Sequence, residues 1–353
     1  MTTNETIRPT TTTTTTLGAT GPAVFPIGLG CMGMSALYGE SDRSESIATI
    51  HAYLDAVPDG MDALLDTGDF YGMGHNELLI NEALRSAPVA LRERALTSVK
   101  FGALRTVDGG FTGIDGRPEA VKNFLAYSLQ RLGRDHVDIY RISRLDPAVP
   151  IEETVGAIAE AVQAGHVRHI GLSEVGADTL RRAAAVAPIA DLQIEYSLMS
   201  RGIEAEILPT ARELGIGITA YGVLARGLIS GHFGRDRQLS ADDFRGMSPR
   251  FQGENLHRNL DLVDALGKVA QEKAVSVAQT AIAWVLAQGR RHQVDIVPLV
   301  GARRRDRLEE ALGALGMELS PADVAAIEAA IPAGAAAGER YPAAQMAHLD
   351  SER

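Results

Sequence analysis

Hydrophobic positions along the chain form short apolar runs that alternate with segments of helical spacing. The runs that have the length of a strand are residues 24–30, 63–67, 95–100, 137–142, 167–172, 191–196, 217–221 and 295–300. Between them, apolar residues recur three and four positions apart, as in amphipathic helices, over residues 44–57, 76–85, 118–132, 151–164, 177–186, 204–214 and 256–272. Regular alternation of strand and helix is typical of a parallel sheet.

Eight such units without a linker-like break favour a closed barrel over an open sheet with a second domain. We therefore predict an α/β fold, a single (β/α)8 TIM barrel over residues 16–332. The dipeptide Thr20-Gly21 predicts the turn of an N-terminal β-hairpin that closes the bottom of the barrel. Residues 226–255 are too long and polar for a simple connection, and we expect a mobile loop over the site.

Both ends of the chain fall outside this pattern. Residues 1–15 are expected to form a disordered N-terminal tail, although the threonine run 10–16 is also compatible with a β-prone interaction tract. The C-terminal extension, residues 333–353, is open between a segment that caps the substrate and a disordered end.

Composition narrows the class of protein. With 45% hydrophobic and 22% charged residues and 36 glycines, the chain matches a globular enzyme with a large core. A net charge of −11 argues against nucleic acid and membrane surfaces as partners, so an anionic ligand requires a local basic patch. The single cysteine, Cys31, can form neither an internal disulfide nor a zinc site. Together with the absence of a signal-like N-terminus, this predicts a cytoplasmic protein.

Residues 28–33 match the glycine fingerprint G-x-G-x-x-G of dinucleotide-binding domains. That motif requires a helix opening on its last glycine and an acidic residue about 20 positions later. Residues 34–41 contain Gly39 and several polar residues, and the next strand ends at Asp66, beyond that spacing. We therefore interpret the glycines as a tight turn after a barrel strand, where the backbone approaches a ligand.

Three residues at neighbouring strand ends suit a hydride transfer coupled to a proton transfer: Asp66, Tyr71 and Lys100. Strand ends of a barrel share one mouth. An ammonium beside a phenol lowers the pKa of the phenol, and a carboxylate keeps that ammonium charged and in position. Each residue alone is explained as well by a cap, a loop residue or a solvated strand end. Their joint placement favours the catalytic interpretation.

Several dispersed motifs together resemble the aldo-keto reductase family across residues 16–332. They are residues 16–18, 27–34, 66–71, Lys100, 144–147, 171–174, 193–197, 221–227 and 301–310. The resemblance implies a barrel without a Rossmann domain, NADPH extended across the strand ends, and a catalytic tetrad of Asp, Tyr, Lys and His.

The residue at the position of the fourth tetrad member differs from the histidine that is usual in the family. The usual sequence is His-Arg-x-Asp-Pro, whereas here Ser143 precedes Arg144-Leu145-Asp146-Pro147. A hydroxyl can donate to a carbonyl oxygen, but it is shorter than imidazole and takes no positive charge. We therefore expect Tyr71 to be the only strong acid, beside a roomier pocket. Whether Ser143 is catalytic or only fills space is open.

This replacement, with residues 171–175, 186–189 and 195–201, resembles the branch that contains pyridoxal reductases. Pyridoxal is therefore the first candidate among small aldehyde and ketone substrates. A reductase of a bulkier ketone is an alternative. A second alternative is a weakly catalytic, nucleotide-sensing regulatory subunit, which the intact Asp66–Tyr71–Lys100 set argues against.

The resemblance also assigns cofactor contacts. Ser173 and Gln193 match residues that hold the carboxamide, Glu174 stands where many members have Asn, and Tyr221 matches the aromatic that stacks on nicotinamide. The remaining assigned positions are Gly30, Met32, Gly222, Leu224, Gly227, Gly301, Arg303, Arg307 and Glu310, with Ala311 in place of the usual Asn.

The arginines of residues 303–307 supply the basic patch that an acidic protein needs for an anionic cofactor. Guanidinium groups suit a 2′-phosphate, which favours NADPH over NADH. An arginine run is otherwise often only a solvated face. No pattern in the sequence predicts a metal site, and the oligomeric state is not predicted.

Overall fold

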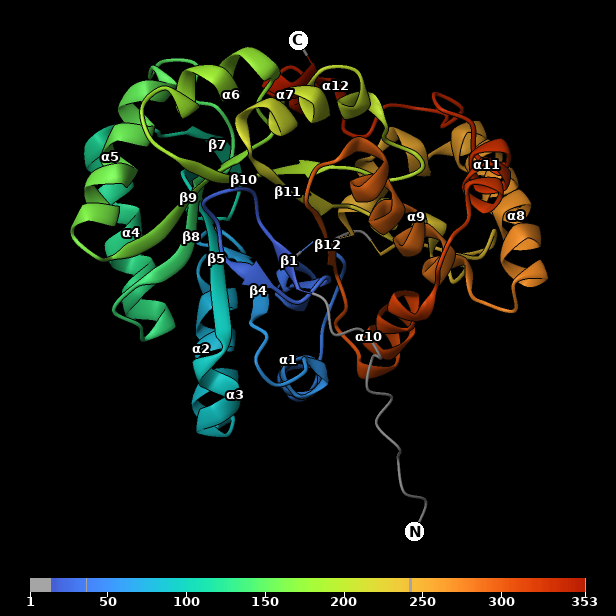
Figure 1. Ribbon diagram of the computed structural model, residues 1–353, viewed down its shortest axis with the longest axis horizontal. Coiled ribbons are helices and arrows are strands. Elements are labelled where there is room, and N and C mark those ends of the chain that lie inside the picture. The colour runs from blue at the N-terminus through green and yellow to red at the C-terminus, as the bar shows by residue number, and fades with distance from the viewer. Residues whose placement is uncertain (1–13, 36, 241–242, 353) are drawn as a thin grey trace.

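The computed structural model describes residues 14–35, 37–240 and 243–352. Its centre is a closed barrel of eight parallel strands, which confirms the predicted (β/α)8 fold (Figure 1). In order around the barrel they are β3 (Gly28–Gly30), β4 (Ala63–Gly68), β5 (Ala95–Phe101), β8 (Val137–Ile142), β9 (Val167–Ser173), β10 (Ile189–Glu195), β11 (Gly217–Tyr221) and β12 (Ile296–Val300). Closure of the sheet excludes the Rossmann interpretation of residues 28–33, because that domain has an open sheet.

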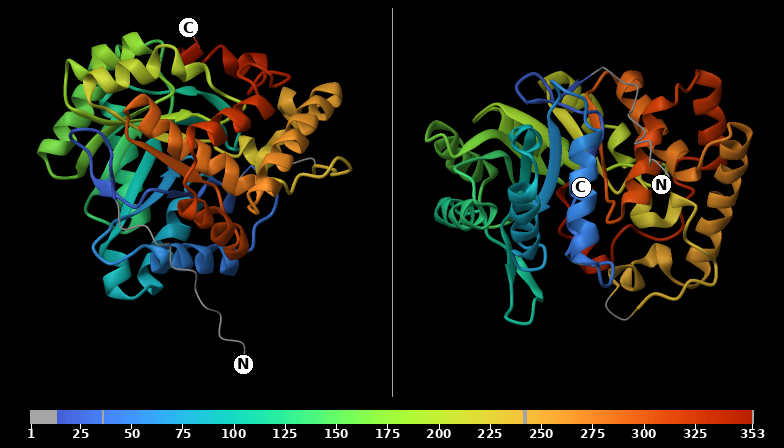
Figure 2. Two further views of the ribbon diagram at one scale, coloured as in Figure 1. Left: turned by 45° about the vertical axis from the view of Figure 1, so that its right-hand side comes forward. Right: turned by 90° about the horizontal axis from the view of Figure 1, so that it is seen from below.

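Helices cover the outside of the barrel. They are α1 (Arg43–Ala56), α2 (His75–Ser86), α3 (Val89–Glu93), α4 (Pro118–Leu132), α5 (Ile151–Gln163), α6 (Ala177–Ala184), α7 (Ile207–Leu214), α8 (Gly253–Glu272), α9 (Val277–His292), α10 (Arg305–Leu312), α11 (Pro321–Ala330) and α12 (Ala343–Met346). Both views of Figure 2 place α8 on the flank opposite α4 and α5. The seven predicted helical segments match α1, α2 and α4–α8 within a few residues, except that residues 204–206 belong to a separate 3-10 turn and its link to α7. Helices α3 and α9–α12 lie outside the predicted segments.

The predicted hairpin is present. Strands β1 (Thr15–Thr16) and β2 (Ala23–Val24) pair antiparallel, and Leu17 and Val24 are fully buried in a cluster with residues of β4, β8 and β12. Gly18 has φ +65°, and a Cβ there would lie 2.5 Å from the carbonyl oxygen of Gly215. Only glycine therefore lets the hairpin close this end of the barrel. The first apolar run, predicted as one strand over residues 24–30, is two strands separated by a bend.

Three segments differ from the expectations. A second hairpin, β6 (Ala103–Arg105) and β7 (Phe111–Ile114), follows β5 and was not predicted. Residues 226–255 contain three 3-10 turns and the buried side chains of Arg245 and Arg250, so this segment is more structured than a plain loop. Its mobility stays a prediction. The predicted tail boundary is also too late, because Thr15 already belongs to β1; residues 1–13 lie outside the described residues.

Candidate active site

The carboxylate of Asp66 lies at the centre of the barrel mouth and receives three donors. Lys100 Nζ lies 2.5 Å from its Oδ1, while Ser98 Oγ and Gln193 Nε2 donate to its Oδ2 at 2.8 and 2.7 Å. These groups come from β4, β5 and β10 and are all buried. Burial lowers the pKa of Lys100 below its ordinary value, with the Asp66 charge opposing this effect. The carboxylate thus fixes the ammonium, as the sequence predicted.

Tyr71 lies in the turn between β4 and α2, next to this pair. Its ring is 8% exposed, and Lys100 Nζ lies 5.2 Å from the ring centroid. Burial, followed by the charge of Asp66, raises the pKa of Tyr71 well above its usual value, and Arg144 opposes the increase. The expectation of a pKa lowered by Lys100 is therefore wrong for this state, because the ammonium is bonded to Asp66 and burial dominates. The phenol is protonated at neutral pH and available as a donor.

Two buried hydroxyls at the mouth have no hydrogen-bond partner among the described residues. They are Ser143 Oγ, just after β8, and Ser173 Oγ, at the end of the neighbouring strand β9. Buried hydroxyls are nearly always hydrogen-bonded in folded proteins. Two orphan hydroxyls beside the Asp66–Lys100 pair indicate a place where a polar ligand supplies the missing partners.

The residues assigned to the nicotinamide end lie together on consecutive strands. Ser173, Gln193 and Tyr221 end or line β9, β10 and β11. The hydroxyl of Tyr221 donates to Glu174 Oε1 at 2.8 Å. Gln193 is already bonded to Asp66 through its amide nitrogen, a link that the sequence did not predict. Of these three residues, only Ser173 has a hydroxyl without a hydrogen-bond partner among the described residues, and it is therefore the best suited to bind the carboxamide of a nicotinamide.

The segment after β11 is a tight turn. Gly222 and Gly227 have φ +66° and +90°, and a Cβ at Gly222 would lie 3.1 Å from Glu195 Cγ. The amide of Gly227 donates to the carbonyl of Leu224 at 2.8 Å. Next to β11 around the barrel, Gly301 follows β12 and Gly30 ends the neighbouring strand β3, and Met32 begins a 3-10 turn. Glycines at these strand ends leave the backbone accessible to a phosphate-bearing ligand.

The predicted arginine patch lies at the start of α10, and each member already has a partner. Arg303 donates to the carbonyls of Tyr38 and Glu40 at 3.0 and 3.1 Å. Arg307 lies 3.2 Å from Glu310 and also contacts His232. Arg304 and Arg305 pair with Asp306 and Glu45. A bound 2′-phosphate would therefore have to compete with the existing acidic partners for these guanidiniums.

The C-terminal extension, which the sequence left open between a cap over the substrate and a disordered end, lies against the mouth. Residues 338–352 turn back over the mouth and bring Arg340 and Tyr341 against Glu174 and Tyr221. In Figure 1 this red segment, with α12, lies beside α6 and α7. The replacement of Asn by Glu174 was the available signal, but nothing in the sequence identified its partner 166 positions later.

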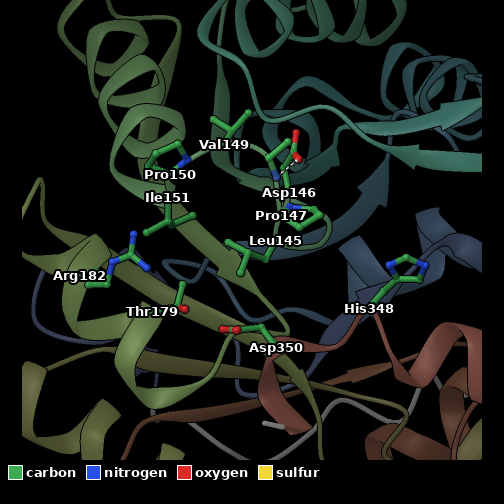
Figure 3. A pocket seen from close by; sticks show the side chains of 11 residues that line it. Leu145, Asp146, Pro147, Val149, Pro150, Ile151, Thr179, Arg182, His348 and Asp350 are labelled. Carbon is green, nitrogen blue, oxygen red and sulfur yellow. Dashed lines mark hydrogen bonds between the residues drawn. The ribbon is translucent and has the colours of Figure 1, made fainter.

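A pocket of about 480 Å³ lies beside the mouth, where this extension meets the connection between β8 and α5 (Figure 3). Its lining includes Leu145–Ile151, Thr179, Arg182, His348 and Asp350. None of Asp66, Tyr71, Lys100 and Ser143 lines it. It is therefore separate from the candidate catalytic residues.

Comparison with known proteins agrees with this fold. The model of the Aldo/keto reductase family matches residues 26–332. The chain belongs to this family. It is accordingly an oxidoreductase that acts on carbonyl or CH–OH groups, in a family that generally uses NAD(P)H. Within the described residues, no group of three or more His, Cys, Asp or Glu side chains is placed to hold a metal ion.

Proteins similar to this aldo-keto reductase include a plant relative and two proteins of known structure. A probable aldo-keto reductase 1 from Glycine max is 39% identical over 327 residues, covering 92% of this chain and 90% of the relative. The glycerol dehydrogenase structure from Gluconobacter oxydans is similar with a TM-score of 0.79 at 28% identity, over 90% of this chain and 94% of that one. A thermostable aldo-keto reductase solved with the inhibitor epalrestat has a TM-score of 0.68 at 24% identity, over 90% and 99% of the two chains, and supports the fold alone.

No helix in the described parts of the chain is long and apolar enough to cross a membrane. The cytoplasmic location stays a prediction.

Proposed function

We propose that this reductase uses NADPH to reduce a small aldehyde or ketone to the alcohol. The observation that carries the proposal is the buried Lys100–Asp66 pair beside the protonated phenol of Tyr71, next to the orphan hydroxyls of Ser143 and Ser173. A carbonyl group bound there meets a proton donor and two hydroxyls without partners.

When bound, the reduced nicotinamide supplies the hydride to the carbonyl carbon. Tyr71 donates its hydroxyl proton to the carbonyl oxygen as negative charge develops there. Lys100 stabilises the resulting phenolate, and Asp66 holds the ammonium at 2.5 Å from its Oδ1. We assign to Ser143 a hydrogen bond to the same oxygen, because its hydroxyl has no partner among the described residues.

One sequence feature supports NADPH as the specific cofactor, and another makes pyridoxal the first candidate substrate. The four arginines at residues 303–307 support NADPH, because guanidinium groups bind a 2′-phosphate well. Ser143 in place of histidine, with the residues around Glu174 and Glu195, makes pyridoxal the first substrate to test. The same departure is the reason to keep a bulkier ketone and a nucleotide-sensing role as alternatives.

The test is the initial rate of NADPH oxidation with pyridoxal and a panel of aldehydes and ketones. Tyr71→Phe is expected to lower kcat by about 10²-fold or more, the usual contribution of a general acid. Tyr127→Phe is the matched control, because Tyr127 is 57% exposed on α4. It should leave the rate unchanged.

The outcomes separate the candidates. A Tyr71-dependent preference for pyridoxal supports that substrate, whereas a preference for a ketone keeps the reductase and rejects pyridoxal. Tight NADPH binding without turnover of any carbonyl compound would contradict the reductase proposal and favour the nucleotide-sensing alternative.

A further inference from the structure

The guanidinium of Arg340 is buried at the barrel mouth between the carboxylates of two buried glutamates, Glu174 and Glu195. A third carboxylate, that of the more exposed Glu352, lies 2.7 Å from its Nη2. Its Nη2 lies 2.6 Å from Glu174 Oε2, and its Nη1 lies 3.0 Å from Glu174 Oε1 and 3.4 Å from Glu195 Oε2. The Arg340 side chain is 6% exposed, and the two glutamates are 0% and 2% exposed. A two-pronged guanidinium–carboxylate contact fixes both groups in orientation as well as distance.

Glu174 is committed to this contact and not free for a cofactor. Besides Arg340, its carboxylate accepts from the hydroxyls of Tyr221 and Ser351 and from the amide of Glu195. Burial opposes its ionisation, but the charge and hydrogen bonds of Arg340 hold the pKa of Glu174 at about 2. Its φ of +54° is costly for glutamate and easier for asparagine. The contact with Arg340 therefore accompanies a backbone conformation that costs more for glutamate than for asparagine.

The next residue, Tyr341, reaches across the mouth. Its hydroxyl lies 2.9 Å from that of Tyr221, which ends β11, and accepts from Arg144 Nη2, just after β8, at 3.4 Å. Around the barrel, β8 and β11 are separated by β9 and β10. The Arg226 guanidinium covers the Tyr341 ring at 4.2 Å from the centroid. Tyr341 therefore lies over the strand ends that carry Ser143 and Ser173.

We propose that Arg340 is a positioning residue that holds Tyr341 as a wall of the carbonyl pocket, and that Tyr341 excludes bulky substrates. The inference rests on the proposed reductase function, because it concerns the same site. Residues 338–352 thus form a fixed part of the pocket: Ser351 bonds to Glu174, and Asp350 Oδ2 accepts from the amide of Gly176 at 2.8 Å.

The experiment compares kcat/KM for a small aldehyde and a bulky aryl ketone in the full-length enzyme. Tyr341→Ala is expected to shift this ratio toward the ketone by about tenfold, since pocket size alone discriminates by about this much. Arg340→Met combined with Glu174→Gln should shift it similarly. The paired change removes both charges of the closest ion pair, so that the buried Glu174 carboxylate is not left without its guanidinium partner. Glu339→Gln, an exposed neighbour, is the matched control and should leave the ratio unchanged.

Combining Tyr341→Ala with the paired change distinguishes positioning from a general loss of stability. If Arg340 acts through Tyr341, the combination adds no more than about a twofold further shift, because coupled residues are not additive. Shifts that multiply, or a paired variant with the wild-type ratio, would overturn the proposal.

Limited trypsin digestion supplies a readout that does not depend on turnover. Arg340 is 5% exposed, so the bond after it should be protected in the wild-type chain. In Glu174→Gln the contact is weakened, and cleavage after Arg340 should be several-fold faster. Equal cleavage rates would reject the anchoring by Glu174. A wild-type protein that reduces no carbonyl but shows this difference would reject the proposed function and leave the anchor standing.

Discussion

At the scale of single residues, Asp69 is an acidic group near the site whose pKa is strongly changed by folding. It lies two positions before Tyr71, is 7% exposed, and receives no hydrogen bond from a side chain of the described residues. Burial, reinforced by the charge of Glu77, raises the pKa of Asp69 to about 8. In the unfolded chain an aspartate has a pKa of about 3.9. The folded protein therefore takes up a proton here that the unfolded chain releases.

This difference predicts how stability depends on pH. Because the folded pKa is raised, the contribution of Asp69 is fully present below about pH 4 and is lost as the pH rises through about 8. Each unit corresponds to about 1.4 kcal/mol, so the loss amounts to a few kcal/mol. Asp69→Asn should flatten the fall of Tm between pH 5 and 9, measured by calorimetry at constant ionic strength. Asp236→Asn, at an exposed position, is the control; if both variants follow the wild-type curve, the burial of Asp69 does not act as described.

Some properties of the site residues were predictable from the sequence and others were not. Asp66 and Lys100 were predictable because both stand at strand ends, and strand ends of a barrel meet in space. The state of Tyr71 was not predictable, because its pKa depends on how deeply the ring is buried. The roles of Gln193 and Glu174 depend on partners from other strands or from the distant C-terminus, which periodicity does not reveal.

At the scale of elements, the start of α10 decides whether the arginine patch recognises a phosphate. Arg303 holds the backbone of residues 38–40, whereas the Arg307 side chain is 41% exposed and bonded to Glu310 and His232. Arg307 is thus the more available guanidinium. To bind the 2′-phosphate, Arg307 has to exchange its ion pair with Glu310 for one with the phosphate. The free-energy difference between these two ion pairs sets how much Arg307 contributes to the affinity for NADPH.

Arg307→Gln should therefore raise the Kd for NADPH by about tenfold or more, since a charged hydrogen bond contributes about 1.5–3 kcal/mol. The Kd for NADH should change little, because NADH lacks the 2′-phosphate. Both are measured by titration calorimetry. Arg235→Gln, an exposed arginine paired with Asp261 and Asp264, controls for lost surface charge. Equal weakening of both cofactors would remove the assignment of Arg307 to the phosphate.

Element boundaries were predicted best where a strand or helix has its own stop signal. Helix α4 begins at Pro118 and ends at Leu132, as predicted. The next residue, Gly133, ends the helix with φ +64°. The run over residues 24–30 was predicted as one strand, because apolar residues also fill the bend between β2 and β3. The β6–β7 hairpin was missed, since its residues are largely exposed and lack an alternating apolar face.

At the scale of the whole molecule, the barrel interior contains a polar triad that length and pattern did not predict. Arg141 Nη2 lies 3.0 Å from Asp191 Oδ1, and Arg141 Nη1 donates to Thr219 Oγ1 at 3.1 Å. Both charged side chains are 0% exposed, on β8 and β10, while Thr219 is on β11. In the sequence these residues are polar interruptions of apolar strands, yet they connect three strands within the run β8-β9-β10-β11 of the closed sheet.

Removing one member should destabilise the entire barrel. Arg141→Met leaves the Asp191 carboxylate buried without its counter-charge, and we expect a loss of about 3–5 kcal/mol in the free energy of unfolding. Urea unfolding followed by circular dichroism measures it. The matched control is Arg182→Met, which removes a surface ion pair with Glu152 whose partners are 53% and 40% exposed. Exposed pairs contribute about 0–1 kcal/mol, so this variant should unfold near the wild-type midpoint.

The double variant Arg141→Met/Asp191→Leu distinguishes two explanations for the destabilisation of the single variant: a buried charge without its partner, and loss of the strand register. If the loss in the single variant comes from the stranded charge, the double variant recovers most of the stability, because apolar replacements of buried pairs are often neutral or stabilising. If the triad instead fixes the register of β8, β10 and β11, the double variant stays destabilised and loses NADPH affinity as well, since Ser173, Gln193 and Tyr221 depend on that register. Recovered stability with wild-type NADPH affinity would show that closure of the barrel rests on its apolar core alone.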